Sequence, residues 1–312
     1  MNAIPDLFPG FAERRIETGR IETGRIETGG IEIFLRTGGS GPPLLLLHGN
    51  PQTHVCWHKM APELARHFTL VIPDLRGYGS SSAPPGDARH EVYSKRAMAQ
   101  DCLAVMRALG HERFMVAGHD RGGRVAYRLA LDHPDAVSAL VPIDIIPTAE
   151  VWRRANAGWA IKSYHWAFLA QPHPLPETMI SHDPVLYLEH TLKSWAESRD
   201  LSPFSVEALA HYRGLLQAPE RVHAICEDYR AGATIDRQLD EADMAAGRKI
   251  TCPTFVLWAS AYLASGPLPV WQAWCTDVSG AEVVSGHFLA EENPTGTLAA
   301  LVPFLLSQRD AG

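Results

Sequence analysis

Asp120 lies in a glycine-rich segment whose residue types and spacing suit a catalytic turn. Residues 118–123 read GHDRGG; the apolar run 114–117 precedes them and the helix-like stretch 123–131 follows. This is the strand–turn–helix elbow usually written GxSxG, with Asp in the serine position. The glycines fit because a Cβ in so tight a turn would collide with the neighbouring strand or helix. An ordinary helix N-cap is the alternative interpretation of this Asp, but glycines on both sides favour a nucleophile.

A carboxylate nucleophile favours a restricted set of reactions. It displaces a leaving group at an sp³ carbon and forms an ester, whose carbonyl carbon water can then attack. A serine alkoxide is better suited to attack on a carbonyl carbon. Asp120 therefore indicates cleavage of a carbon–halogen or an epoxide bond rather than hydrolysis of an ester or amide.

Two further residues are expected to act with Asp120. His287, in the sequence SGHF after the final apolar run, is the expected general base that activates water against the ester. The stretch 258–263, after the penultimate apolar run, contains no carboxylate, whereas Asp144 follows the run before it. A charge within the apolar segment 142–146 is costly unless it is paired. Asp144 is therefore expected to fix the tautomer of His287.

The elements that must position these residues alternate between strand-like and helix-like segments. Apolar runs without polar alternation, typical of strands covered on both faces, occupy residues 44–47, 69–72, 114–117, 137–143, 255–258 and 281–284. Helical patterns such as 97–109 and 123–131 lie between them. The alternation predicts an α/β fold with a mostly parallel, doubly wound sheet.

One long gap interrupts this alternation. Residues from about 148 to 240 carry amphipathic helical patterns and few strand-like runs. We therefore expect residues 1–147 and 241–312 to form the core and residues 148–240 to form an inserted helical cap. Residues 15–29 read RIETG three times. A five-residue period matches neither helix nor strand, and three copies cannot build a solenoid of ~20-residue units, so we expect an N-terminal hairpin or arm without chemistry.

Composition and charge exclude several classes of function. Of 312 residues, 46% are hydrophobic and 20% charged, as in an ordinary globular protein. The formal charge is −7 with no basic stripe, so nucleic acid is not an expected partner. The N-terminus lacks a signal-peptide pattern and no apolar stretch approaches the ~20 residues that span a bilayer, so no membrane partner is expected. Five cysteines without metal-ligand spacing predict free thiols in the cytoplasm, and no metal.

Eight short motifs between residues 42 and 306 carry a family resemblance: HGNPQ at 48–52, DLRGYG at 74–79, GHDRGGR at 118–124, LDHPD at 131–135, DIIPT at 144–148, YHW at 164–166, DYRAG at 228–232 and GHF at 286–288. Through them the chain resembles bacterial fluoroacetate (haloacetate) dehalogenases of the α/β-hydrolase superfamily. The resemblance implies hydrolysis of small haloacids without a cofactor, fluoroacetate and water giving glycolate and fluoride through an aspartyl ester. It also implies a homodimer.

The resemblance assigns Asp120, Asp144 and His287 to the catalytic triad of that family, and Arg121 and Arg124 to its carboxylate clamp. The positions and chemistry of the two arginines also support this role without the resemblance. Arg124 lies one helical turn beyond Asp120, so both can face one cavity, and two guanidinium groups can hold a carboxylate in a fixed, multidentate geometry. The alternative is that the arginines are structural ion-pair partners.

His165, Trp166 and Tyr229 look like the halide pocket of the family. All three side chains carry a hydrogen-bond donor, which suits a small, hard fluoride; taken singly, they would more often be packing residues of the cap. Asn50 departs from the family pattern, in which Phe is expected in the HGxP motif, but its backbone N–H at the pocket mouth should still stabilise negative charge. The segment 259–275 also departs from it, with consequences for the rim or a subunit contact.

Two other functions compete with the dehalogenase. An epoxide hydrolase shares the Asp nucleophile and the His base, but needs two cap tyrosines aimed at the epoxide oxygen; those available are Tyr164, Tyr187, Tyr212 and Tyr229. A neutral epoxide does not need two arginines beside the nucleophile. A catalytically silent ligand receptor is the third hypothesis, and the intact set of Asp120, Asp144 and His287 counts against it.

Overall fold

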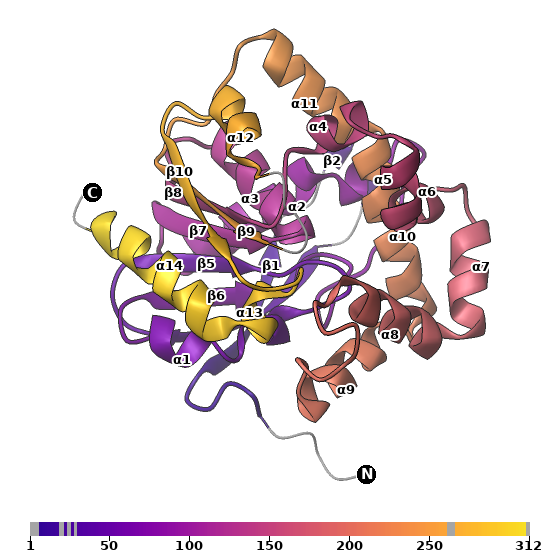
Figure 1. Ribbon diagram of the computed structural model, residues 1–312, viewed down its shortest axis with the longest axis horizontal. Coiled ribbons are helices and arrows are strands. Elements are labelled where there is room, and N and C mark those ends of the chain that lie inside the picture. The colour runs from indigo at the N-terminus through magenta and orange to yellow at the C-terminus, as the bar shows by residue number, and fades with distance from the viewer. Residues whose placement is uncertain (1–5, 19–21, 24–25, 28–29, 261–265, 310–312) are drawn as a thin grey trace.

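The computed structural model describes residues 6–18, 22–23, 26–27, 30–260 and 266–309. At its centre is an eight-stranded sheet in the order β1-β4-β6-β5-β7-β8-β9-β10 (Figure 1). Its strands are β1 (Ala12–Thr18), β4 (Ile31–Gly39), β5 (Pro43–Leu47), β6 (Thr69–Pro73), β7 (Phe114–His119), β8 (Val137–Ile143), β9 (Thr254–Ala259) and β10 (Val278–Val283). β4 is antiparallel to β1 and β6, and the strands from β6 to β10 are parallel. The predicted α/β fold with a mostly parallel sheet is confirmed.

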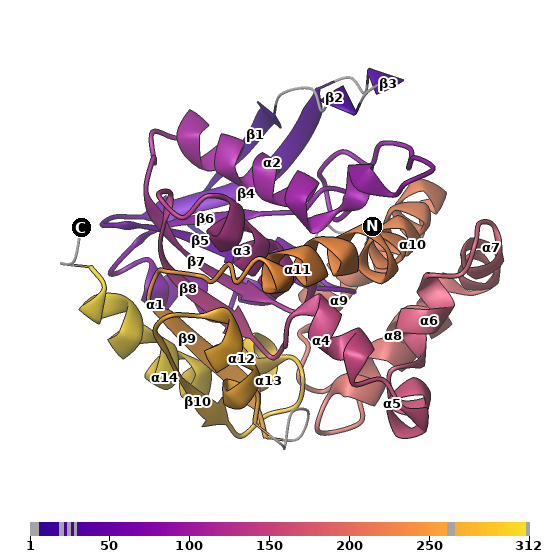
Figure 2. The ribbon, with the colours of Figure 1, turned by 90° about the horizontal axis from the view of Figure 1, so that it is seen from above.

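Helices cover both faces of this sheet, which explains its uninterrupted apolar strands. Leu44 to Leu47 of β5 are all fully buried, as expected where neither face meets water. The helices of the core are α1 (Ala61–Leu64), α2 (Lys95–Ala108), α3 (Arg121–Asp132), α12 (Leu268–Trp274), α13 (Leu289–Glu292) and α14 (Pro294–Ser307). Two short 3₁₀ helices, η1 (His54–Trp57) and η2 (Glu91–Tyr93), lie in loops. α2 and α3 lie on one side of the sheet and α1 and α14 on the other (Figures 1 and 2).

A group of helices lies between β8 and β9 in the chain. They are α4 (Thr148–Arg153), α5 (Ala157–Lys162), α6 (Tyr164–Leu169), α7 (Leu175–His182), α8 (Pro184–Trp195), α9 (Val206–Leu215), α10 (Pro219–Ala233) and α11 (Ile235–Ala245). In Figure 1, α5 to α10 gather to one side of the sheet. The boundary predicted at residue 240 falls inside α11, so that helix crosses it. The division into core and cap stays a prediction about domain organisation.

The repeated segment near the N-terminus forms strands. The first RIETG copy contributes to β1, and the second and third contribute β2 (Glu22–Thr23) and β3 (Ile26–Glu27), which pair antiparallel. This arrangement agrees with the expected hairpin. The remaining residues of the repeat, 19–21, 24–25 and 28–29, lie outside the described residues.

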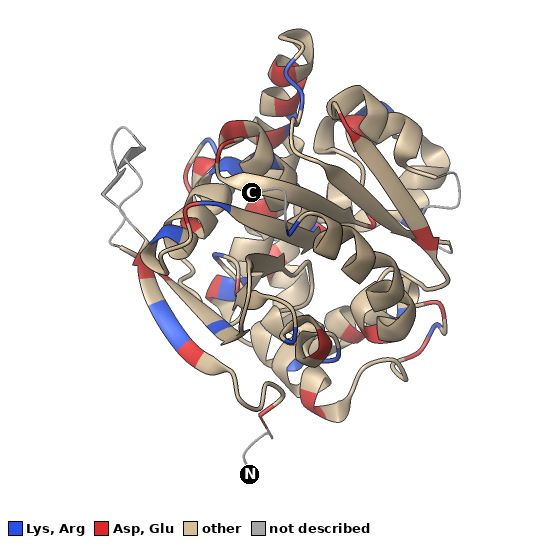
Figure 3. Ribbon diagram, turned by 90° about the vertical axis from the view of Figure 1, so that its left-hand side faces the viewer, with Lys and Arg blue, Asp and Glu red and all other residues tan. Residues whose placement is uncertain are grey.

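Two general features bear on what the surface can bind. Acidic and basic residues are interspersed over the elements visible in Figure 3. Among the described residues, no helix has both the length and the apolar character needed to cross a membrane.

The turn from β7 into α3 is packed tightly against backbone atoms. Asp120 has φ +48° and ψ −114°, which a residue with a side chain rarely adopts. A Cβ on Gly122 would lie 2.3 Å from the carbonyl oxygen of His48, and one on Gly118 would lie 2.4 Å from that of Gly122. Since both obstacles are backbone atoms, they cannot move aside easily. The turn therefore requires glycine on both sides of Asp120.

Gly122→Ala should destabilise the fold by about 1–3 kcal/mol or more, because the new methyl group overlaps backbone. Gly214→Ala is the matched control: Gly214 lies in α9 with nothing within 4 Å of an added Cβ, so the free energy of unfolding should rise by up to about 1 kcal/mol. Urea unfolding of both variants measures the difference. Equal stabilities would mean that the turn is not crowded.

Candidate active site

Asp120, Asp144 and His287 come together at the carboxyl edge of the sheet. Asp120 follows β7, Asp144 follows β8 and His287 lies in the loop after β10. The Nδ1 of His287 is 2.6 Å from Oδ2 of Asp144, while its Nε2 is 3.9 Å from Oδ2 of Asp120. The other oxygen of Asp144 accepts a hydrogen bond of 2.9 Å from the backbone N–H of Ala259. Asp144 thus fixes the Nδ1 of the imidazole, and the Nε2 is directed toward Asp120.

The electrostatics of these three residues favour a charged nucleophile and a basic imidazole. Burial opposes ionisation of Asp120, but the charges of His287, Arg121 and Arg124 outweigh it and lower its pKa. Burial likewise opposes protonation of His287, but the hydrogen bond to Asp144 and its negative charge outweigh it and raise the pKa of the imidazole. Asp120 is therefore ionised at neutral pH, and His287 is a stronger base than a free histidine.

Asn50 connects Asp120 to Tyr229 of α10. Its backbone N–H donates a hydrogen bond of 2.9 Å to Oδ1 of Asp120. Its side-chain amide donates a long hydrogen bond of 3.4 Å to the hydroxyl oxygen of Tyr229. Because the Tyr229 oxygen acts as acceptor here, its own O–H is left to donate elsewhere. The polar side chain that departs from the family pattern thus contacts a predicted halide-binding residue.

Arg121 is fully buried and ion-paired. Its Nε and Nη2 contact the carboxylate of Asp228, the closest approach being 2.6 Å. The same carboxylate contacts the ammonium group of Lys95 and accepts a hydrogen bond of 2.8 Å from Tyr78. These charges outweigh the effect of burial and hold the pKa of Asp228 far below its usual range. Nη1 of Arg121 is buried and has no hydrogen-bond partner among the described residues.

Arg124 is buried as well, but its partners are neutral. Its Nη1 donates to the carbonyl oxygen of Ile146 at 3.0 Å and to the hydroxyl of Thr148 at 3.2 Å. Among the described residues, no carboxylate lies within ion-pair distance of it, and its Nε has no hydrogen-bond partner. Burial and the like charge of Arg121 lower the pKa of Arg124. Arg124 is thus a buried cation whose charge the protein only partly offsets.

The three predicted halide-binding side chains form one aromatic group against these arginines. Trp166 and His165 of α6 meet Tyr229 of α10 edge-on, with ring centroids 5.9 and 5.8 Å apart. The guanidinium of Arg121 lies 4.2 Å from the Tyr229 ring centroid and that of Arg124 lies 4.5 Å from the Trp166 ring. Burial lowers the pKa of His165 to about 3, so this imidazole is neutral.

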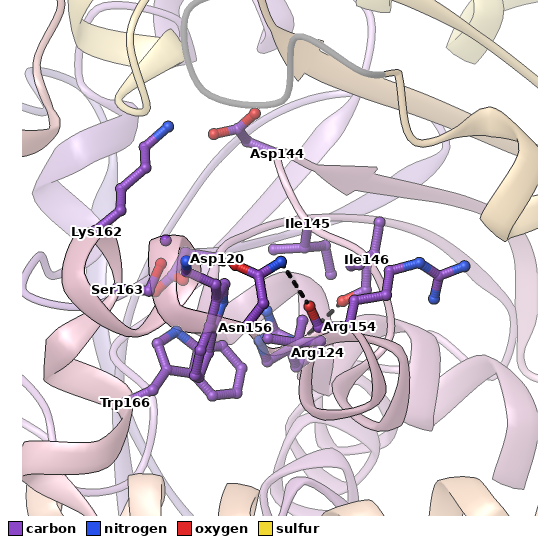
Figure 4. A pocket seen from close by; sticks show the side chains of 13 residues that line it. Asp120, Arg124, Asp144, Ile145, Ile146, Arg154, Asn156, Lys162, Ser163 and Trp166 are labelled. Carbon is purple, nitrogen blue, oxygen red and sulfur yellow. Dashed lines mark hydrogen bonds between the residues drawn. The ribbon is translucent and has the colours of Figure 1, made fainter.

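A cavity of about 370 Å³ opens onto part of this group (Figure 4). Its lining residues are Asp120, Arg124, Asp144, Ile145, Ile146, Val151, Arg154, Asn156, Gly158, Trp159, Lys162, Ser163 and Trp166. In Figure 4, Asp120 and Trp166 face the same space, with Arg124 beneath it. The structure thus brings the predicted nucleophile, one predicted clamp arginine and one predicted halide donor to one cavity.

One cluster of metal-type ligands lies elsewhere in the described chain. His173, Glu177 and His223 place one ligand atom each within 4.8 Å of one another, between α7 and α10. Arg230 already forms two hydrogen bonds to Glu177, of 2.7 and 3.0 Å. Because this ion pair neutralises the carboxylate, we assign the cluster a structural role in the cap.

Sequence reasoning missed several residues of the site. Asp228 stands beside Tyr229 within DYRAG, but Glu227 and Arg230 also lie in this charged stretch, so no local pattern marks Asp228 as the partner of Arg121. The segment 259–275, which departs from the family pattern, contributes Trp271, whose indole N–H donates to the carbonyl oxygen of Ile145 at 3.0 Å. It thus supports the residue next to Asp144. Residues 261–265 of that segment lie outside the described residues.

Comparisons with known proteins agree with the fold. The model of the alpha/beta hydrolase fold family matches residues 42–293, so the chain belongs to that family. A fluoroacetate dehalogenase from Burkholderia sp is 42% identical, covering 97% of this chain and 96% of the relative. Within the family, the chain belongs to a haloacetate dehalogenase-like group.

Other relatives have different descriptions. A soluble epoxide hydrolase from Corynebacterium sp. is 32% identical over 88% of this chain and 93% of the relative. A solved structure from Nostoc sp PCC 7120, provisionally described as an alpha/beta hydrolase, is 48% identical with a TM-score of 0.88; the match covers 95% of this chain and 98% of that one. The likeness therefore establishes a hydrolase and leaves its substrate to be argued from the site.

The ion pair between Arg121 and Asp228 should be important for stability. Asp228→Asn keeps the shape of the side chain but leaves Arg121 and Lys95 without their shared counter-charge. Loss of one partner of a buried pair typically costs about 3–5 kcal/mol. Urea unfolding measures the loss, with the exposed Asp200→Asn as the control, where we expect little change in the free energy of unfolding. A small effect at Asp228 would mean that water or another residue compensates the two cations.

Proposed function

We propose that this protein is a haloacetate dehalogenase, which hydrolyses fluoroacetate and related haloacetates through an ester on Asp120. The observation that carries the proposal is Arg124, a buried cation that lines the cavity of Asp120 and has no carboxylate partner in the described chain. A buried cation is costly unless it is compensated. A substrate carboxylate would supply that compensation and would relieve the repulsion between Arg124 and Arg121.

The first step is displacement of halide. Arg124 and the Nη1 of Arg121 hold the substrate carboxylate, so that the adjacent carbon faces Asp120. An oxygen of Asp120 attacks this carbon, the carbon–halogen bond breaks, and halide leaves with the bonding electrons. The product is an ester between Asp120 and the carboxymethyl group. Neutral donors on His165, Trp166 and Tyr229 stabilise the halide as its charge develops.

The second step is hydrolysis of that ester. His287 removes a proton from water, and the resulting hydroxide attacks the carboxyl carbon of Asp120. Asp144 holds the imidazole in the required tautomer and stabilises its charged form. The backbone N–H of Asn50, which donates to Oδ1 of Asp120, stabilises the oxyanion of the intermediate. Collapse of the intermediate breaks the bond between the Asp120 carboxyl carbon and the glycolate oxygen. That oxygen takes the proton from His287, so glycolate leaves and both Asp120 and His287 are restored.

The epoxide hydrolase alternative shares Asp120 and His287, but it needs two cap tyrosines at the nucleophile. Tyr229 lies within the site. Tyr212 donates its hydroxyl to Glu291 at 2.9 Å, and Tyr164 and Tyr187 line a separate groove on the cap. Only Tyr229 is therefore in a position to contact the substrate. A silent receptor role is disfavoured because the base and the nucleophile are aligned. A homodimer and a cytoplasmic location, implied by the family resemblance, stay predictions.

His287→Asn should trap the covalent intermediate, because alkylation of Asp120 does not require the base whereas ester hydrolysis does. Incubation with chloroacetate, followed by intact-protein mass spectrometry, should show one added carboxymethyl group, and peptide mapping should place it on Asp120. Styrene oxide provides the control for the epoxide alternative. An unmodified mass beside an active wild type would contradict the mechanism.

The pH dependence of ester hydrolysis should follow the raised pKa of His287. The base acts only when neutral, so the rate should fall as pH decreases through that pKa, with a midpoint above the ordinary histidine value of about 6.5. Asp144→Asn removes the charge that raises this pKa and should move the midpoint downward while slowing hydrolysis. Single-turnover rates between pH 5 and 9 test both expectations. If the midpoint did not move, Asp144 would not be the residue that raises the pKa of His287.

Trp166→Phe and Arg124→Gln should separate the halide pocket from the carboxylate clamp. The substrate carboxylate is charged throughout, so Arg124→Gln should weaken all haloacetates similarly. Fluoride develops charge only as its bond breaks, so Trp166→Phe should lower kcat/KM for fluoroacetate by about a hundredfold and less for bromoacetate, whose leaving group depends less on hydrogen bonding. Measurements with the three monohaloacetates test this. A penalty equal for all halogens would exclude Trp166 from the halide pocket.

A further inference from the structure

Glu292, at the end of α13, accepts three backbone hydrogen bonds around the loop that carries His287. Its Oε1 accepts from the N–H of Phe288 at 2.8 Å, and its Oε2 accepts from that of Gly286 at 3.1 Å. These are the two residues that flank His287. The third donor is the N–H of Glu197, at 2.8 Å from Oε2, and it belongs to the segment after α8. One carboxylate thus holds both sides of the histidine and a piece of the cap.

The backbone of His287 itself is fixed at both of its polar groups. Its N–H donates to the carbonyl oxygen of Trp195, the last residue of α8, at 3.1 Å. Its carbonyl oxygen lies 2.7 Å from Nε2 of His119. Burial lowers the pKa of His119 to about 3, so this ring is neutral and donates its N–H. The histidine loop is therefore attached to the cap through Trp195 and to the nucleophile turn through His119.

The packing at this point leaves little freedom for the loop. A Cβ on Gly286 would lie 2.3 Å from the backbone nitrogen of Glu197 and 2.7 Å from both oxygens of Glu292. The indole of Trp195 packs on the His287 ring at 5.4 Å and on His165 at 4.4 Å, measured between ring centroids. Gly286 of the histidine loop is thus in direct contact with the backbone of Glu197 and with the carboxylate of Glu292.

We propose that Glu292 is a positioning residue that sets the imidazole of His287 relative to Asp120 and links that position to the cap. Three hydrogen bonds to one carboxylate define the loop more strictly than neutral contacts do, since bonds to a charged acceptor are shorter and stronger. The inference rests on the proposed function, because its consequence is expressed in the two half-reactions. Water attack depends on the placement of His287, whereas displacement of halide by Asp120 does not.

Glu292→Gln tests the proposal. The amide places an NH₂ group where an oxygen accepted hydrogen bonds, so at least one N–H loses its acceptor. We expect alkylation by chloroacetate to stay within about twofold of wild type and ester hydrolysis to fall by about ten- to a hundredfold, as for a small misplacement of a catalytic group. The alkylated enzyme should then accumulate during turnover. Because unfolded protein is not alkylated, the ratio of the two rates does not depend on the folded fraction.

Glu197→Gln is the matched control. Glu197 lies at the same junction and its side chain is exposed, but it contributes only its backbone N–H to Glu292. The substitution removes a nearby charge and keeps all three hydrogen bonds, so both half-reactions should stay at the wild-type rate. Glu292→Asp separates geometry from charge, because its shorter carboxylate cannot reach all three donors. It should accumulate ester as Glu292→Gln does.

The pH profile of hydrolysis distinguishes positioning from general destabilisation. The charged or titratable groups around His287 are Asp144, Asp120, His119, His165 and Glu292. Glu292→Gln removes one negative charge, so the midpoint should move slightly downward, whereas Glu292→Asp should leave it near the wild-type value. Equal slowing of both half-reactions, or no accumulation of ester, would overturn the proposal. If His287→Asn forms no ester either, the proposed function itself fails.

Discussion

The backbone at Asp120 is held in a conformation that residues with side chains avoid, and the site depends on this constraint. A strained backbone conformation of this kind persists only where contacts with the surrounding structure hold it in place. Here, the glycines of the turn pack against backbone atoms of β5 and of the turn itself. The carboxylate consequently projects from the carboxyl edge of the sheet, where the N–H of Asn50 can reach it. The same turn starts α3, so that Arg121 and Arg124 enter the site within its first turns.

Charge balance explains the rest of the arrangement. The protein itself neutralises Arg121 with Asp228, which it shares with Lys95, and it pairs His287 with Asp144. The first pair holds Arg121 against the ring of Tyr229, and the second directs Nε2 of His287 toward Asp120. Arg124 differs because its protein partners are a carbonyl and a hydroxyl. The alternative, in which both arginines are structural ion-pair partners, thus applies to the Nε and Nη2 of Arg121, which bind Asp228. It does not apply to Arg124.

How much of this site the sequence predicts depends on whether the residues involved carry a local sequence pattern or interact across a long stretch of the chain. The strands and the catalytic turn have local patterns, so Asp120, Asp144 and His287 could be placed at the ends of strands and expected to meet. The partner of Arg121 lies 107 residues further along the chain, and nothing local connects the two. Glu292 had no signal at all, because a carboxylate that accepts backbone N–H groups looks like any acidic residue near a helix end. Element boundaries also shifted, as at α11, since side-chain patterns weaken at helix ends.

The absence of charge on the predicted halide-binding side chains, His165, Trp166 and Tyr229, bears on how a haloacetate would be oriented in the site. A haloacetate has two ends that accept hydrogen bonds, and only its carboxylate is charged before reaction. With His165 neutral, because burial lowers its pKa to about 3, the cations in contact with the rings of Trp166 and Tyr229 are the guanidinium groups of Arg121 and Arg124. In the proposed reaction, the substrate carboxylate would be drawn to Arg121 and Arg124, and the weakly accepting halogen to His165, Trp166 and Tyr229. A protonated His165 would attract the carboxylate to the wrong end and turn the reacting carbon away from Asp120. Specificity of this kind depends on what the pocket disfavours as much as on what it binds.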